Sequence, residues 1–235
     1  MEVDTAVAVA TSRRRGSDDA GSRRAQIIRA ATSVLARQGY NDTSLKEIAR
    51  EAGVAPGLLH YYFESKEELL LDVVHLLDRE LTQTWQRAVA NIEDPLERIT
   101  AALDAAEARC SQQPEFWRLM FDLYMLGLSN PAIHRRCQEL WSRFVDDIEA
   151  EVRQVLGRLP AYAIVPPREL AGTVAAAIDG ISLAALIEAK SPAPHFRALK
   201  MLLLSLVVTA YVTSGQEPPI ERLRELVARS PSSPA

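Results

Sequence analysis

The apolar residues of this chain recur at steps of three and four along most of its 235 residues. The clearest stretch holds Ile133, Cys137, Leu140, Trp141, Phe144, Ile148, Val152 and Val155. This spacing puts the apolar side chains on one face of an α-helix. Asp94-Pro95, Gln113-Pro114 and Asn130-Pro131 each combine a polar residue with a proline, which ends one helix and admits the next. We therefore predict an all-α fold of nine or ten helices.

Two short helices are predicted near the N-terminus, after a first helix from Ser22 to Gly39. Ser44-Leu-Lys-Glu47 has the capping-box pattern, so a helix should begin there and run to about Ala52. Gly53 then breaks it, and Pro56 can open another helix because the missing proline N–H would be unpaired at that position. These dimensions predict a helix-turn-helix over residues 44–63.

The last long helices are the most apolar. After a loop at 160–167, one is predicted to reach about Ala189 and another to run from His195 to Ser214, apolar almost all round. A membrane span is disfavoured, because the uninterrupted stretch is shorter than roughly 18 residues and contains Arg197 and Lys200. A helix without a polar face must be covered, and a second copy of the chain is the natural cover. We expect a homodimer through these eighth and ninth helices.

Charge is unevenly placed along the sequence. The formal net charge is −4, yet residues 1–66 carry ten Lys/Arg and eight Asp/Glu, so only this part is a candidate for meeting phosphate. The two cysteines lack a CxxC spacing, and the first twenty-one residues lack the apolar core of a signal peptide. We expect a cytoplasmic protein with flexible tails at 1–21 and 230–235.

The residue types of the third helix favour DNA. Leu59 and Phe63, four apart, can face a small core, which leaves Pro56, Gly57, His60 and Tyr61 facing outward. Hydroxyl and imidazole groups suit phosphate and base-edge contacts, and Lys66 can reach a phosphate. The alternative is that Tyr61 and Tyr62 only cap the small core.

Residues 22–82 resemble the DNA-binding domain of the TetR family of bacterial repressors. The matching run is Gly39-Tyr40-x-x-Thr43-Ser44-x-x-x-Ile48-Ala49-x-x-Ala52-Gly53-Val54, followed by Gly57-x-Leu59-x-Tyr61-x-Phe63-x-x-Lys66-x-x-Leu69. The resemblance implies an N-terminal three-helix DNA-binding domain with the helix-turn-helix, and a helical effector-binding and dimerisation domain over residues 83–229. The stretch Ile178-Asp179-Gly180 resembles the betaine-regulator branch of that family.

The same resemblance assigns roles to single residues. It implies that Ser44 and Lys46 hold the DNA backbone, that Pro56, Gly57, Leu58, His60 and Tyr61 face the major groove, and that Tyr62 and Lys66 lie at phosphates. The order His60-Tyr61-Tyr62 departs from the common Tyr-Tyr-His, Leu58 stands where a polar residue is frequent, and Glu64 where a basic one is. The implied function is a repressor that leaves a palindromic operator when a ligand shifts the fourth helix.

A cluster of aromatic and polar residues in the predicted sixth and seventh helices suggests a site for a small, partly apolar effector. Its members are Trp117, Phe121, Tyr124, Met125, His134, Trp141 and Phe144. Asp179, on an otherwise apolar helix, is either an acceptor in that site or a polar group at the dimer seam. Plain core packing is the alternative for the aromatic residues. The Arg13–Arg15 triplet is either a solvated tail or a minor-groove arm.

Catalysis is not expected. Asp72-x-x-His75 imitates half of a helical-bundle metal motif, but no other histidine has a carboxylate three residues before it. The sequence has no GxSxG and no phosphate loop, and we predict no cofactor and no metal. Two rival functions remain: a helical ligand-binding or scaffolding protein without DNA binding, and a constitutive DNA binder without an effector.

Overall fold

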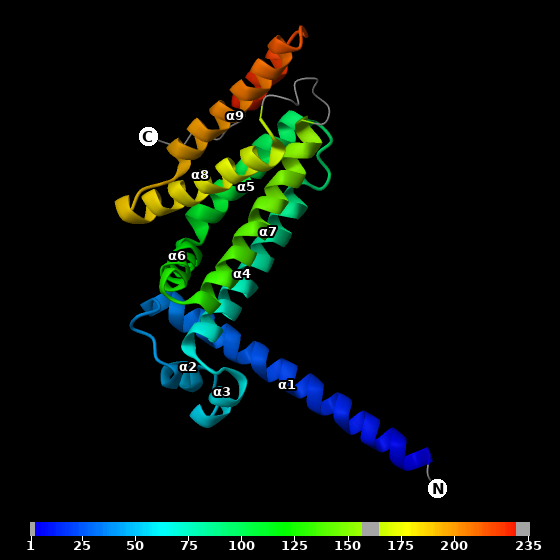
Figure 1. The fold of residues 1–235 in the computed structure, drawn as a ribbon, viewed down its shortest axis with the longest axis vertical. Coiled ribbons are helices and arrows are strands. Elements are labelled where there is room, and N and C mark those ends of the chain that lie inside the picture. The colour runs from blue at the N-terminus through cyan, green and yellow to red at the C-terminus, as the bar shows by residue number, and fades with distance from the viewer. Residues whose placement is uncertain (1–2, 157–164, 229–235) are drawn as a thin grey trace.

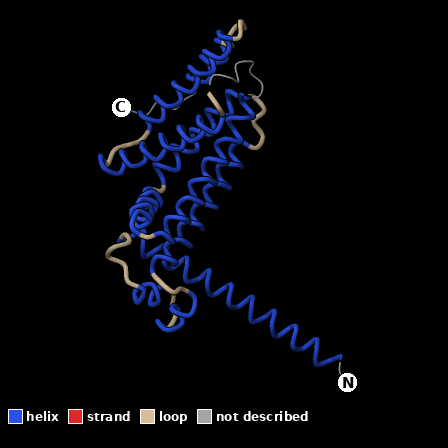
Figure 2. Tube along the Cα trace, viewed as in Figure 1, coloured by secondary structure: helices blue, strands red, loops and turns tan. Residues whose placement is uncertain are grey.

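The structure, a computed structural model, describes residues 3–156 and 165–228. Within these ranges it contains ten helices and no strand, which confirms the all-α prediction (Figure 2). The helices are α1 (Val3–Gln38), α2 (Leu45–Glu51), α3 (Pro56–Tyr62), α4 (Lys66–Val89), α5 (Pro95–Gln112), α6 (Pro114–Ser129), α7 (Pro131–Leu156), α8 (Pro167–Glu188), α9 (Ala193–Thr213) and α10 (Ile220–Ala228).

The first helix is longer than expected. Residues 1–21 were expected to form a flexible tail, but α1 begins at Val3 and its first half projects away from the other helices (Figure 1). The segment holds several alanines and arginines, which favour helix, and no proline that would end it. The predicted C-terminal tail at 230–235 and most of the predicted loop at 160–167 lie outside the described residues.

One continuous core joins the N-terminal helices to the rest of the chain. It runs from Ile27 and Leu35 on α1, through Phe63 and Leu70, to Phe196 on α9, all of them buried. In Figure 1, α2 and α3 lie beneath α1, and α4 rises from them beside α7. Because apolar packing is continuous from α1 to α6 and α8, a displacement of α6 or α8 would shift the side chains packed against α1.

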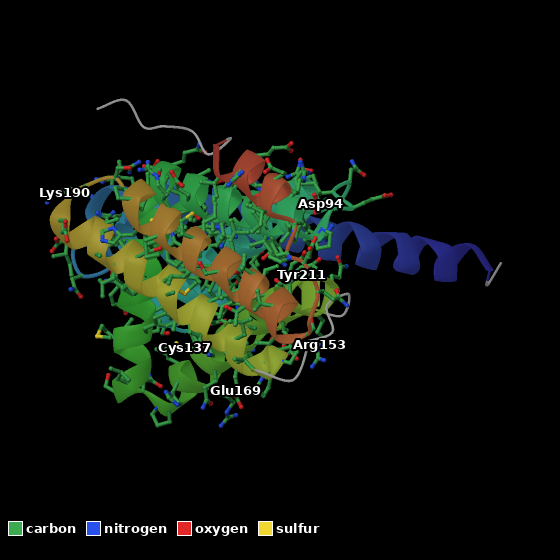
Figure 3. The ribbon with its side chains drawn as sticks, turned by 90° about the horizontal axis from the view of Figure 1, so that it is seen from above. Asp94, Cys137, Arg153, Glu169, Lys190 and Tyr211 are labelled. Atoms are coloured by element: carbon green, nitrogen blue, oxygen red, sulfur yellow. The ribbon has the colours of Figure 1, made fainter. Side chains whose placement is uncertain are left out.

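Two neighbouring helices keep large apolar side chains in contact with solvent. Leu183 and Ile187 on α8 and Met201, Leu202, Leu206 and Val212 on α9 are exposed. Figure 3 shows α9 alongside α8 on one side of the molecule. By length and composition alone both helices could span a membrane, and 28% of each apolar window is buried. That test is weak, because apolar helices of a soluble protein pass it too.

Candidate nucleic-acid interface and internal cavity

Local capping signals fix the turn between α2 and α3. The Ser44 side chain accepts a hydrogen bond from the Glu47 N–H, and the Glu47 carboxylate accepts one from the Ser44 N–H. These hydrogen bonds lower the pKa of Glu47. Gly53 adopts a φ of 65°, a left-handed conformation that glycine takes without strain, and the following Val54 N–H donates to the Ala49 carbonyl. The predicted helix-turn-helix is present.

Helix α3 is held by one face and leaves the other free. Leu59 and Phe63 are 0% and 1% exposed and anchor the helix in the core, as their spacing predicts. The opposite side carries Tyr61, which is 80% exposed, together with the exposed Pro56, Gly57, Leu58 and His60. These are the five residues that the family resemblance assigns to the major groove, and all five are exposed in the structure.

The flanking residues are held by contacts to α1 and α4. Tyr62 is half-buried, its ring edge-on to Tyr61 with centroids 5.2 Å apart, and its carbonyl accepts from Arg24. Arg24 also lies 4.5 Å from the centroid of the Phe63 ring and pairs with Asp72 at 2.6 Å. The end of α3 is therefore pinned to both long helices.

The predicted phosphate ligands lie beside this surface. Ser44 and Lys46 are exposed at the start of α2. Lys66, at the start of α4, is half-buried, and its ammonium nitrogen lies 4.0 Å from the centroid of the Tyr40 ring. Its desolvation lowers the pKa of Lys66, against the opposing effect of Glu67.

A cavity of about 130 Å³ opens between α4, α5, α6, α7, α8 and α9. Its wall is largely apolar, with Trp85, Trp117 and Phe144 as aromatic members. Two charged patches interrupt it. Arg98 and Glu151 are hydrogen-bonded to each other, whereas Arg109 and Asp147 are not paired within 4 Å among the described residues. Such a wall suits an amphipathic guest with an apolar body.

A smaller cavity of about 20 Å³ shares Arg109, Trp117 and Phe144 with the first and adds carboxyl groups. It is lined by Asp78 on α4, Tyr124 on α6 and Asp179 on α8. Burial raises the pKa of Asp179 to about 7, although the Tyr124 hydroxyl and the Arg109 guanidinium oppose this shift. Asp179 thus faces the interior, one of the two positions the sequence left open.

One guanidinium faces three carboxyl groups in this region. Burial lowers the pKa of Arg109, and the carboxyls of Asp78, Asp147 and Asp179 oppose that shift. Burial raises the pKa of Asp78 and of Asp147 as well. The Arg143 guanidinium also opposes the shifts of Asp78 and Asp147. With all of these groups ionised, three carboxylates face two guanidiniums, and a cationic or hydrogen-donating guest would relieve the remaining negative charge.

The predicted effector residues divide into three groups. Trp117, Tyr124, Phe144 and Asp179 line these cavities. Phe121 packs against the rings of Trp117 and Tyr124 without lining either cavity, and Trp141 packs against the buried cluster of α7 and α8. Met125 is 62% exposed and His134 is exposed, because both side chains lie on the outer sides of α6 and α7.

Sequence reasoning missed Arg109, Asp78 and Asp147. A signal existed, since Arg109 follows Leu103 and Ala106 at steps of three, so a charge falls on the buried face of α5. Asp72, the carboxylate of the Asp72-x-x-His75 pattern, forms an ion pair with Arg24. Among the described residues, no group of His, Cys, Asp and Glu side chains could hold a metal ion.

Comparison with known proteins agrees with this geometry. Residues 27–73 match the family model of bacterial regulatory proteins of the tetR family, and residues 95–207 match the C-terminal model of BetI-type transcriptional repressors. A transcriptional regulator BetI of Brucella canis is 30% identical over 172 residues, which span 72% of this chain and 83% of that protein. This chain belongs to the TetR family of transcriptional regulators.

Two further proteins are similar to this chain, one over a shorter stretch of sequence and one in its fold. A BetI regulator of Brucella anthropi is 41% identical over 81 residues, covering 34% of this chain and 42% of that protein. Among solved structures, a protein from Saccharomonospora viridis in complex with choline superposes with a TM-score of 0.66 at 21% identity, covering 78% of this chain and 96% of that one. At that identity the likeness concerns the TetR fold alone.

Proposed function

We propose that this TetR-family regulator is a cytoplasmic repressor that binds a palindromic operator as a homodimer and releases it when an effector enters the cavity. Residues 22–82 would bind DNA, and residues 83–229 would bind the effector and the second subunit. The observation that carries the proposal is the free face of α3, where Tyr61 is 80% exposed while Leu59 beneath it is fully buried. A two-turn helix anchored in this way suits insertion into the major groove.

The exposed apolar side chains of α8 and α9 support the dimer. Single exposed apolar residues are ordinary on a protein surface, but six on two adjacent helices form a patch. In a two-fold dimer, each subunit would cover this patch on the other. Two recognition helices related by that axis would read half-sites about 34 to 36 Å apart, one turn of DNA.

The effector that fits the cavity best is a small organic cation with an apolar body. Aromatic faces attract cations, and Trp85, Trp117 and Phe144 line the cavity. Asp147 places a carboxyl group at the wall of this cavity, and Asp179 places one in the smaller cavity that shares Arg109, Trp117 and Phe144 with it. The choline bound by the related fold from Saccharomonospora viridis belongs to this chemical class.

The DNA proposal is tested with a double variant of α3 and a control variant of α7. The duplex would first be selected from random-sequence DNA by the purified protein, and light scattering of the complex should give two chains per duplex. Replacing both His60 and Tyr61 by alanine should weaken binding at least tenfold, since lost base and phosphate contacts cost about 1–3 kcal/mol each. His134→Ala, which removes an exposed histidine of α7, is the control and should bind like the native protein. Equal affinity of all three proteins would refute the assignment of α3.

A further inference from the structure

Helix α6 touches the cavities with one face and the DNA-binding helices with another. Trp117 and Tyr124 line the cavities. From the other side of the helix, the Arg118 guanidinium donates to the carbonyl oxygens of Leu35 and Ala36 at the end of α1. The Asp122 carboxylate accepts a hydrogen bond of 3.3 Å from the Tyr40 N–H. One rigid helix therefore links the cavity wall to the turn that follows α1.

Tyr40 collects three contacts from different elements. It is 8% exposed, and its hydroxyl donates to the Glu67 carboxylate at 2.7 Å. Its ring lies 4.0 Å from the Lys66 ammonium nitrogen, and its N–H is held by Asp122. Burial and the Glu67 carboxylate raise the pKa of Tyr40, so the hydroxyl remains a donor at neutral pH. The ring cannot shift without moving the surroundings of Lys66.

We propose that Tyr40 is a positioning residue through which α6 sets the location of the Lys66 ammonium group. The inference rests on the proposed DNA-binding function, in which Lys66 contacts a phosphate. A guest that displaces Trp117 or Tyr124 also displaces Asp122, two residues from Tyr124 on the same helix, and with it the backbone of Tyr40. The cavity then acts on a phosphate contact directly, in addition to any change in the spacing of the two α3 helices.

A double-mutant cycle on DNA binding tests this relay. In the native background, Asp122→Ala should weaken binding of the selected duplex about threefold, the range expected for losing a cation–π contact that orients an ammonium group. In a Lys66→Ala background the same substitution should change affinity little, because the group that it positions is gone. Asp122→Ala should also reduce the salt dependence of binding by about one phosphate contact, as Lys66→Ala does.

Three further variants separate positioning from general damage. Asp122→Asn keeps an oxygen that can accept from the Tyr40 N–H and should restore affinity. Tyr40→Phe removes the hydroxyl that fixes the ring at Glu67 and should reproduce the altered salt dependence, even if Asp122→Ala fails to fold. Asp146→Ala removes the same charge from α7, where Asp146 pairs with Arg168, and should match the native protein.

The outcomes are distinct. Additive effects of Asp122→Ala and Lys66→Ala, or an unchanged salt dependence in Asp122→Ala and Tyr40→Phe, would overturn the relay while leaving the DNA proposal intact. A native protein that binds no duplex at low salt would instead remove the proposed function, and the relay with it.

Discussion

The two faces of α6 lead to regions that are built in opposite ways. Below it, α2 and α3 present an exposed surface whose residues lie within a short stretch of sequence and are held by local hydrogen bonds such as the Ser44–Glu47 capping box. Above it, residues from six helices, α4 to α9, line the two cavities and place ionisable groups such as Arg109 in a largely apolar wall. The surface is fixed by local signals, whereas the cavity is fixed by how long helices cross.

This contrast lies in the hydrogen bonds that shape each part. The capping bonds of the surface span only three residues, from Ser44 to Glu47, although Leu59 and Phe63 join the core that continues into the helices above. A cavity lined by six helices changes its chemistry with each lining residue.

The largest effect is expected from the buried carboxyl of Asp179. Its pKa is raised to about 7 in the folded protein, so the folded chain keeps a proton that the unfolded chain releases near pH 4. The free energy of unfolding should therefore fall as the pH rises from about 4 to about 7, by on the order of 4 kcal/mol for a shift of this size. The asparagine of Asp179→Asn cannot ionise, so the free energy of unfolding of this variant should not fall in this way.

Urea unfolding of both proteins at pH 5 and pH 8 provides the measurement. The variant should gain stability relative to the native protein at pH 8, and the gain should shrink at pH 5, where the native carboxyl is protonated. Parallel pH profiles would contradict the buried position of Asp179 and with it the difference between cavity and surface.

The second effect concerns the guest of the cavity. Choline, titrated by calorimetry, should bind more tightly as the pH rises from 6 to 8, because ionised Asp179 attracts a cation and protonated Asp179 does not. The gain is limited to about tenfold by the fraction of Asp179 that ionises over this range. The uncharged carbon isostere of choline is the matched control and should bind weakly at both pH values. If the isostere binds as well as choline, the cavity recognises shape alone, and the proposal of a cationic effector is wrong.

The same division shows how far the sequence predicts the structure. Capping and proline signals placed α2, α3 and most later helix ends within a few residues, because each signal acts over four residues or fewer. The start of α1 was wrong, since no single residue marks the end of a helical preference in residues 3–21. Arg109 and Asp78 were missed because their meeting depends on how α4 and α5 cross, which sequence periodicity does not encode.

The smallest effect tests whether local signals hold the surface. Ser44→Ala removes the side-chain acceptor for the Glu47 N–H and should lower the free energy of unfolding by about 1 kcal/mol, the usual contribution of an N-cap. Ser44→Asp supplies another acceptor at the same helix start and should stay close to the native stability. Thermal unfolding of the three proteins compares them directly. If alanine and aspartate behaved alike, α2 would be held by the core alone, through Ile48 and Ala49, and the surface would depend on long-range packing as the cavity does.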